Sequence, residues 1–196
     1  MPATEVLGLL DTVRSHAVDA CIGGGWAVDA LLGEQTRGHS DLDLWVDATD
    51  LERLFVAFTE RGLDRIFPWP GDRPWNFVLH DGGTRRVDLH LYEPVGAGRL
   101  HYGSVTSPFL FDERDLSGRG SIAGTEVRCE HPVFSVSCHG GYQPRDSDRH
   151  DVDLLCSRFE IPPPEEYRSP TGQLGRGSQP GRPESPQRPG RSPEGI

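Results

Sequence analysis

Residues 23–47 read GGGWAVDALLGEQTRGHSDLDLWVD, and this stretch decides the fold. Three glycines open it and lead into a segment with the composition of a short helix. A basic, histidine-bearing loop follows, and two aspartates spaced i, i+2 close the stretch on an apparent strand. Glycines let the backbone approach a phosphate, and carboxylates hold a divalent cation. These are the parts needed to handle a nucleoside triphosphate.

Residues 40–47 alternate between two faces, as a half-buried strand does. One face carries Leu42, Leu44 and Val46, and the other carries Asp41, Asp43, Trp45 and Asp47. Because i and i+2 project from the same side, Asp41 and Asp43 are placed to bind one hard cation. A DxD pair alone also fits a solvent-exposed strand, but aspartate is poorly suited to strands.

A second acidic strand is predicted over residues 85–92, after the hairpin turn Asp81-Gly82-Gly83. Its polar face carries Arg86, Asp88, His90 and Tyr92. If this strand lies beside the first, Asp88 supplies a third carboxylate. Three converging carboxylates suit a two-metal site, with ions about 3.5–4 Å apart, that orients an attacking hydroxyl and a departing pyrophosphate.

The glycine turn and the loop after it fit either a phosphate-binding site or ordinary connecting structure. Gly24 and Gly25 precede a helix whose N-terminal N–H groups favour an anion. The sequence has neither the GxGxxG nor the GK[ST] pattern, so an ordinary strand-to-helix turn fits it equally. Arg37 is placed to neutralise triphosphate charge and His39 to donate to a phosphate oxygen, or both lie in an exposed loop.

Further elements are predicted from periodicity. Helices are expected over 4–17, 26–32, 50–61, from 132–138 and over 147–158, and strands over 20–22, 75–80 and 125–129. Residues 68–74 are expected to form a proline-rich loop. Residues 94–121 are poorly periodic, so we expect a long loop there with a short strand or two.

Composition bounds the organisation of the 196-residue chain. Residues 1–161 are predicted to form one domain, with a core over 1–93 and an acceptor-side loop and C-terminal helices over 94–161. Residues 162–196 are rich in Pro, Gly, Ser and Arg and are predicted to be a disordered tail. No apolar run is long enough to span a membrane, and the N-terminus lacks a signal-peptide pattern, so a cytoplasmic location is expected.

The net charge of −10 argues against a nucleic-acid partner and is compatible with a cationic small molecule. Negative charge that merely maintains solubility explains the composition equally well. The four cysteines match no zinc motif and are expected to be reduced, buried thiols.

Residues 23–47 resemble the signature of the nucleotidyltransferase superfamily to which DNA polymerase β belongs: a glycine turn, hDhD on a strand and a later third acid. The fuller form, GGGWAVDALLG…TRGHSDLDL, is closer to the small antibiotic nucleotidyltransferases that modify aminoglycosides (2''-hydroxyl) and lincosamides. The segment HGGYQPRDSDRHDVDLLC resembles the C-terminal helical portion of that group. The matching residues are Trp26, Asp29, Gly33, Thr36, Arg37, His39, Asp41, Asp43 and Asp88.

The resemblance implies an α+β fold, a mixed polymerase β-like sheet flanked by helices, with a small C-terminal helical part. It implies magnesium-dependent transfer of a nucleoside monophosphate, commonly AMP from ATP, to a hydroxyl, with two Mg²⁺ ions. Asp41 and Asp43 would bind metal, and Asp88 would complete the metal site or take the hydroxyl proton. Gly24, Gly25, Arg37 and His39 would hold the triphosphate, and the acceptor pocket would include His90, Tyr92 and Tyr142.

Two alternatives stay open at this point: transfer of the nucleotide to a protein or an RNA end, and a non-catalytic nucleotide-binding module. The acidic composition disfavours RNA, and the intact carboxylates disfavour a degenerate module. The sequence leaves the acceptor and the oligomeric state open, a homodimer among the options.

Overall fold

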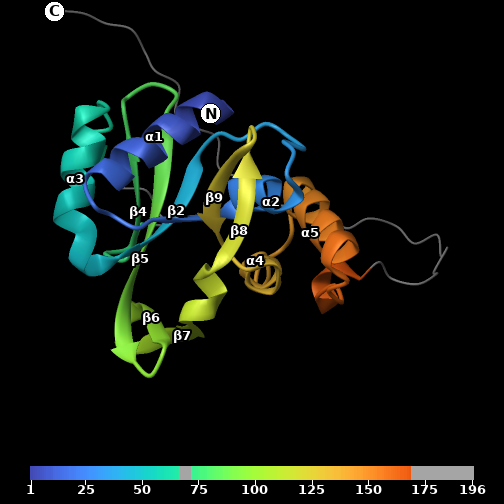
Figure 1. Ribbon diagram of the computed structural model, residues 1–196. Helices are drawn as coiled ribbons and strands as arrows, with labels where there is room; N and C mark the ends of the chain where they lie inside the picture. The colour runs from blue at the N-terminus through green and yellow to red at the C-terminus, as the bar shows by residue number, and fades with distance from the viewer. Residues whose placement is uncertain (67–71, 169–196) are drawn as a thin grey trace, which may run out of the picture.

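The computed structural model of the protein describes residues 1–66 and 72–168 (Figure 1). They form a mixed sheet flanked by helices, which is the predicted α+β class. The strand order is β3–β4–β5–β2–β1–β9–β8, and the β6–β7 hairpin continues from β5. Helix α1 packs with α3, while α2, α4 and α5 form a second group of helices next to β8 and β9.

The strands are β1 (Cys21–Gly23), β2 (Leu42–Asp47), β3 (Arg65–Ile66), β4 (Asn76–His80), β5 (Arg86–Gly96), β6 (Arg99–Ser104), β7 (Ser107–Asp112), β8 (Gly118–Ile122) and β9 (Thr125–Cys129). The helices are α1 (Ala3–Ser15), α2 (Gly24–Leu32), α3 (Leu51–Glu60), α4 (Pro132–Cys138) and α5 (Asp146–Phe159). Short 3-10 turns are η1 (Ala48–Asp50), η2 (Glu113–Leu116) and η3 (Glu165–Tyr167). Outside residues 94–121, each predicted helix and strand is present, with its ends either as predicted or shifted by a few residues.

The pairing of β2 with its neighbours brings the glycine turn and the two acidic strands together. Strand β2 runs antiparallel to β1, with Gly23 opposite Asp43, and parallel to β5, with Asp43 opposite Asp88. A slip of one residue would turn the apolar face of either strand away from the core, so burial fixes this register. The apolar residues concerned all lie in the largest core cluster: Leu42, Leu44, Val46, Val87, Leu89 and Leu91.

The other face of β2 and β5 is less polar than the alternation predicted. Trp45 and Tyr92 are 5% and 8% exposed, respectively, and they pack with Phe111 and Phe134 in a second core cluster. Alternation assigns side chains to a face, but it does not show what covers that face. Here the β7 strand and α4 cover it, since Phe111 belongs to β7 and Phe134 to α4.

The expectation of a long loop over residues 94–121 is wrong. The segment contains the end of β5, the β6–β7 hairpin, η2 and β8. Glycines with positive φ, such as Gly98 at 71° and Gly103 at 105°, interrupt its pattern. Phe109 and Leu110 are each 48% exposed, so the hairpin does not bury one clean apolar face and its alternation is correspondingly weak.

The start of the predicted disordered tail also differs from the structure. Residues 162–168 are described, and Tyr167 in η3 is 6% exposed in the core cluster between α4 and α5. Its hydroxyl donates to the His139 carbonyl oxygen over 2.6 Å. The proline-rich composition of this segment gives no indication that a single aromatic side chain, Tyr167, is buried in the core. The rest of the predicted tail, 169–196, and residues 68–71 of the predicted proline-rich loop lie outside the described residues.

The described cysteines are all free thiols, as expected. Cys21 and Cys129 are buried, whereas Cys138 is exposed and Cys156 is half-buried, so burial was predicted correctly for two of them. Among the described residues, no helix combines the length and the apolar character that crossing a bilayer requires.

Replacing Tyr167 with Phe is expected to lower the free energy of unfolding by about 1 kcal/mol, because a buried hydroxyl loses its hydrogen bond. Tyr167→Ala is expected to cost about 3 kcal/mol or more, because the buried ring is lost as well. Urea unfolding followed by circular dichroism measures both changes. Val105→Ala, at a side chain that is 91% exposed, is the control. An unchanged unfolding midpoint for Tyr167→Ala would show that residues 162–168 add nothing to the fold.

Candidate active site

A cavity of about 460 Å³ lies where α2, β2 and β5 meet α4 and α5. Every site residue predicted from the sequence lines it except Tyr92, which packs in the second core cluster instead. A larger cavity, of about 590 Å³ between α1 and β9, includes neither the glycine turn nor the carboxylates. The predicted residues that line the smaller cavity are Gly24, Gly25, Arg37, His39, Asp41, Asp43, Asp88, His90 and Tyr142.

The glycine turn is in close contact with the charged groups of the cavity. Gly24 has a φ of 56°, and a Cβ atom placed there would lie 2.6 Å from Cγ of Asp43. A Cβ at Gly25 would lie 2.6 Å from Nδ1 of His39. Both positions therefore exclude a side chain. Gly24 and Gly25 are the first residues of α2 and line this cavity, and the helix has no side-chain cap, so its first N–H groups are available to an anion.

His39 is held by a buried carboxylate on α2. Its Nε2 bonds Oδ2 of Asp29, and both side chains are almost fully buried. Oδ1 of Asp29 also accepts from the backbone N–H and the hydroxyl of Thr36, at 2.9 and 2.8 Å. Because Asp29 holds Nε2, the other ring nitrogen of His39 is turned toward Gly25 and the cavity.

Arg37 is fixed in the same way by α5. Its Nε donates to Asp151 over 2.8 Å, and Nη2 donates to the second oxygen of that carboxylate. Asp151 is 1% exposed, and Nε2 of His139 lies 3.7 Å from it. The hydrogen bonds to Asp151 raise the pKa of Arg37, so the guanidinium remains a fixed positive charge beside the glycine turn.

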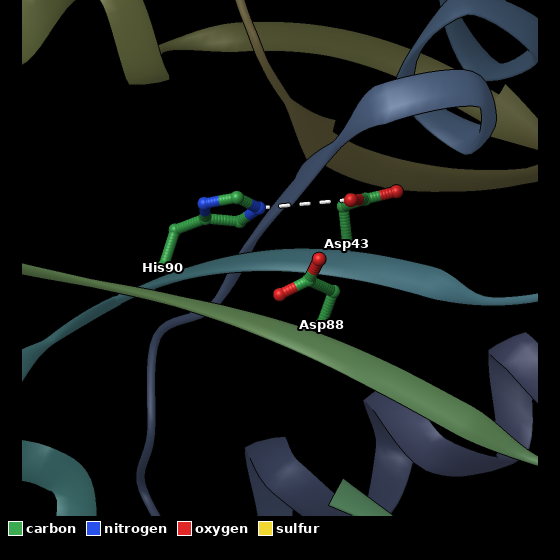
Figure 2. A group of neighbouring side chains, drawn as sticks. All are labelled: Asp43, Asp88 and His90. Atoms are coloured by element: carbon green, nitrogen blue, oxygen red, sulfur yellow. Dashed lines mark ion pairs between the residues drawn. The ribbon is translucent and has the colours of Figure 1, made fainter. Parts of the chain in front are cut away.

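The two acidic strands bring Asp43, Asp88 and His90 together, as Figure 2 shows. One ligand atom from each lies within 4.8 Å of the others, and His90 Nε2 is 3.6 Å from Oδ1 of Asp43. Burial raises the pKa of Asp88 to about 6, the Asp43 and Asp41 carboxylates add to this, and His90 and Asn76 oppose it. Asn76 Nδ2 donates to Asp88 Oδ1 over 2.7 Å.

Asp41 takes a different place from the one its spacing predicts. It lies one residue before β2, so the strand pairing does not impose the same-face geometry on it. It still lines the cavity, but it stands outside the group of mutually close ligand atoms formed by Asp43, Asp88 and His90. All three predicted aspartates line the cavity, but the mutually close ligand atoms belong to Asp43, Asp88 and His90.

The far wall of the cavity comes, apart from Tyr142, from residues that the sequence pattern did not identify. Glu130, which follows β9, is 2% exposed and accepts a hydrogen bond from Trp45 Nε1 over 2.7 Å. Burial raises its pKa, against the effect of that hydrogen bond. The only feature of the sequence that could have pointed to Glu130 is its position, as a charged residue directly after a short predicted strand. The wall is completed by His139, Tyr142, Arg145, Ser147 and Asp148.

A family model described as aminoglycoside-2''-adenylyltransferase matches residues 5–155. The chain belongs to this family. It is therefore a nucleotidyltransferase, and the resemblance inferred from residues 23–47 is confirmed.

Relatives of this adenylyltransferase-family chain include a lincosamide resistance protein of Staphylococcus haemolyticus. The two are 22% identical over 153 residues, which cover 78% of this chain and 93% of the relative. The crystal structure of lincosamide antibiotic adenylyltransferase LnuA, lincomycin-bound, matches with a TM-score of 0.68 at 22% identity, over 79% of this chain and 96% of that one. ANT(2'')-Ia in complex with adenylyl-2''-tobramycin matches with a TM-score of 0.63 at 21% identity, over 80% and 88%. These structures share the fold of this chain.

Gly24→Ala is expected to reduce nucleotidyl transfer by about 10²-fold or more, because the added methyl group displaces Asp43. The left-handed conformation adds about 1–2 kcal/mol of strain, which a melting curve will register. Gly38→Ala is the matched control, because nothing lies within 4 Å of a Cβ there. Pyrophosphate release measures the rate, and equal rates for the two variants would contradict the tight contact at Gly24.

Proposed function

We propose that this nucleotidyltransferase transfers a nucleoside monophosphate, AMP from ATP, to a hydroxyl of an aminoglycoside or lincosamide antibiotic. The observation that carries the proposal is the β2–β5 register, which sets Asp43 opposite Asp88 in one cavity with the glycine turn. The names of the family and of its relatives support the adenylyl group and the antibiotic acceptor.

The triphosphate is assigned to the α2 side of the cavity. Gly24 and Gly25 carry no side chain, so the backbone at the start of α2 lies close to Asp43, Arg37 and His39 and can approach a phosphate. Arg37 offers a charge that Asp151 already holds in place, so little side-chain entropy is lost on binding. His39, held through Nε2 by Asp29, presents its other ring nitrogen to a phosphate oxygen.

Divalent cations are assigned to Asp41, Asp43 and Asp88, and Mg²⁺ is the proposed ion, with two ions as the family resemblance implies. The donor set fits, since carboxylate oxygens and phosphate oxygens are the ligands that Mg²⁺ prefers. Burial raises the pKa of Asp88, and the nearby Asp43 carboxylate raises it further, so a bound cation would favour the ionised form of this carboxyl group. A bound cation supplies neutralisation of the phosphate charge and orientation of the reacting oxygens.

The chemical step is a displacement at the α-phosphorus. The acceptor hydroxyl oxygen forms a bond to phosphorus, the bond to the bridging oxygen breaks, and pyrophosphate leaves. The hydroxyl proton passes to a carboxylate of the Asp41, Asp43 and Asp88 set, or onward to solvent. Arg37 and His39 stabilise the charge that builds on the departing pyrophosphate.

The acceptor is assigned to the wall formed by α4 and α5, with Tyr142 among its contacts. His90, the second acceptor contact predicted from the sequence, lies on β5 beside Asp43 instead. Tyr92, predicted as a third contact, is left out of this proposal because it is buried away from the cavity. Acidic groups such as Glu130 lie on this wall, and the whole chain carries a charge of −10. Both features support a cationic small molecule rather than a nucleic acid. A cytoplasmic location and a homodimer stay predictions.

Asp43→Asn is expected to reduce nucleotide transfer by at least about 10²-fold, because one cation-binding carboxylate is lost. Asp47→Asn is the matched control on the same strand: Asp47 caps η1 by accepting from the Thr49 N–H over 2.8 Å, outside the cavity. Pyrophosphate release is measured with Mg²⁺, each nucleoside triphosphate and a panel of aminoglycosides and lincosamides. Mass spectrometry of the panel identifies the adduct.

Two outcomes would overturn the proposal. The first is a folded protein that releases no pyrophosphate with any nucleotide or acceptor, while calorimetry shows ATP binding; this result favours a non-catalytic module. The second is a labelled macromolecular band after incubation of labelled ATP in a lysate, with no labelled antibiotic; this result favours transfer to a protein or RNA.

A further inference from the structure

His90 stands among the cation-binding carboxylates rather than on the acceptor wall. Figure 2 shows its ring directed at Asp43, with the Asp88 carboxylate beside them. Ligand atoms about 2.1 Å from a metal ion are about 3 to 4 Å apart. The 3.6 Å between His90 Nε2 and Asp43 Oδ1 falls inside that range, and the three donors lie within 4.8 Å of one another.

The ring of His90 is held so that Nε2 faces the carboxylates. Trp45 stacks on it, with centroids 4.7 Å apart and planes at 27°. On the far side, Nδ1 lies 3.0 Å from the hydroxyl oxygen of Tyr102 and 3.4 Å from Nδ2 of Asn76. When Nδ1 carries the hydrogen and donates it to Tyr102, Nε2 has a free lone pair. Histidines that bind metals are oriented in this way, with the second ring nitrogen bonded to an acceptor.

We propose that His90 binds metal together with Asp43 and Asp88, and that this mixed nitrogen and oxygen site prefers Mn²⁺ or Co²⁺ to Mg²⁺. This inference rests on the proposed function, because it assigns a ligand to the same cation site. Mg²⁺ strongly favours oxygen ligands, whereas imidazole suits first-row transition metals. The third-ligand position is filled by His90 because Asp41, which lies before β2, stands outside the close group.

The arrangement also explains why three aromatic side chains gather beside an acidic site. Trp45 and Tyr102 contact His90, and Phe111 packs on Trp45 at a centroid distance of 5.4 Å. They fix the ring that would otherwise rotate between solvent and the carboxylates. A histidine fixed before the ion arrives loses less entropy on binding it.

The test measures metal binding by the full chain in the absence of nucleotide. The purified protein is stripped of metal and titrated with Mn²⁺, and free Mn²⁺ is followed by electron paramagnetic resonance. Competition with Mg²⁺ gives the second affinity. We expect His90→Phe, which keeps a ring against Trp45, to weaken Mn²⁺ binding by about tenfold while Mg²⁺ affinity changes by less than about twofold. His90→Asp is expected to bring the two affinities closer together, because every ligand is then an oxygen.

The matched control is His101→Phe, which removes a histidine from β6 that lies near Glu93 rather than in the cavity. It should leave both affinities unchanged. Nitrogen coupling from imidazole in the pulsed spectrum of bound Mn²⁺ gives a direct readout. It should be present in the unmodified protein and in His101→Phe and absent in His90→Phe. Where His90→Phe does not fold by circular dichroism, His90→Asn replaces it.

Two results would overturn the inference: Mn²⁺ bound to the unmodified protein without nitrogen coupling, or coupling that persists after His90 is replaced. Pyrophosphate release with Mg²⁺ is measured in parallel. Transfer activity without nitrogen coupling would reject His90 as a ligand and leave the proposed function standing. Nitrogen coupling without transfer activity in the presence of any metal would support His90 as a ligand and reject the proposed function.

Discussion

The parallel pairing of β2 with β5 is the constraint on which the rest of the structure depends. It sets two carboxylates, Asp43 and Asp88, opposite each other, an arrangement that charge repulsion alone opposes. The opposite faces of the same strands repay that cost, since their apolar side chains are buried in the main core. The burial that stabilises the sheet therefore also fixes the register of the acids. The apolar core contains neither Asp43 nor Asp88, but it holds the strands in the register that keeps these two carboxylates close together.

Alternation was enough to predict this half of the site. In residues 40–47 and 85–92, a strict apolar face implies the position of the other face, so Asp43, Asp88 and His90 could be placed from the sequence. The same reasoning failed for Tyr92, because a strand pattern shows which way a side chain points and not what packs against it. The covering aromatic residues come from β7 and α4, including Phe111 and Phe134, and their segments carry weak or short patterns.

The residues that support the site could not be predicted, because they act across long sequence separations. Arg37 and Asp151 are 114 residues apart, and Trp45 and Glu130 are 85 apart. In the sequence, Asp151 belongs to a charged helix whose acids fit capping and solvation equally well. The packing of α5 against α2 buries Asp151, which then holds the Arg37 guanidinium beside the glycine turn. The local sequence is enough to select Arg37 as a site residue, but only the tertiary structure shows that Asp151 is its partner.

The two halves of the cavity are consequently held in place by different interactions. The α2 side is rigid, because Gly24 and Gly25 exclude side chains and Asp29 and Asp151 are buried partners of the cationic groups. The α4–α5 side is anchored in part by Tyr167, whose hydroxyl donates to the carbonyl of His139 at the start of the segment that carries Tyr142. Substitutions on that second wall would change the proposed acceptor site without disturbing the β2–β5 register. A fold of this kind can keep one nucleotide chemistry while its acceptor changes, because different parts of the core hold the two halves.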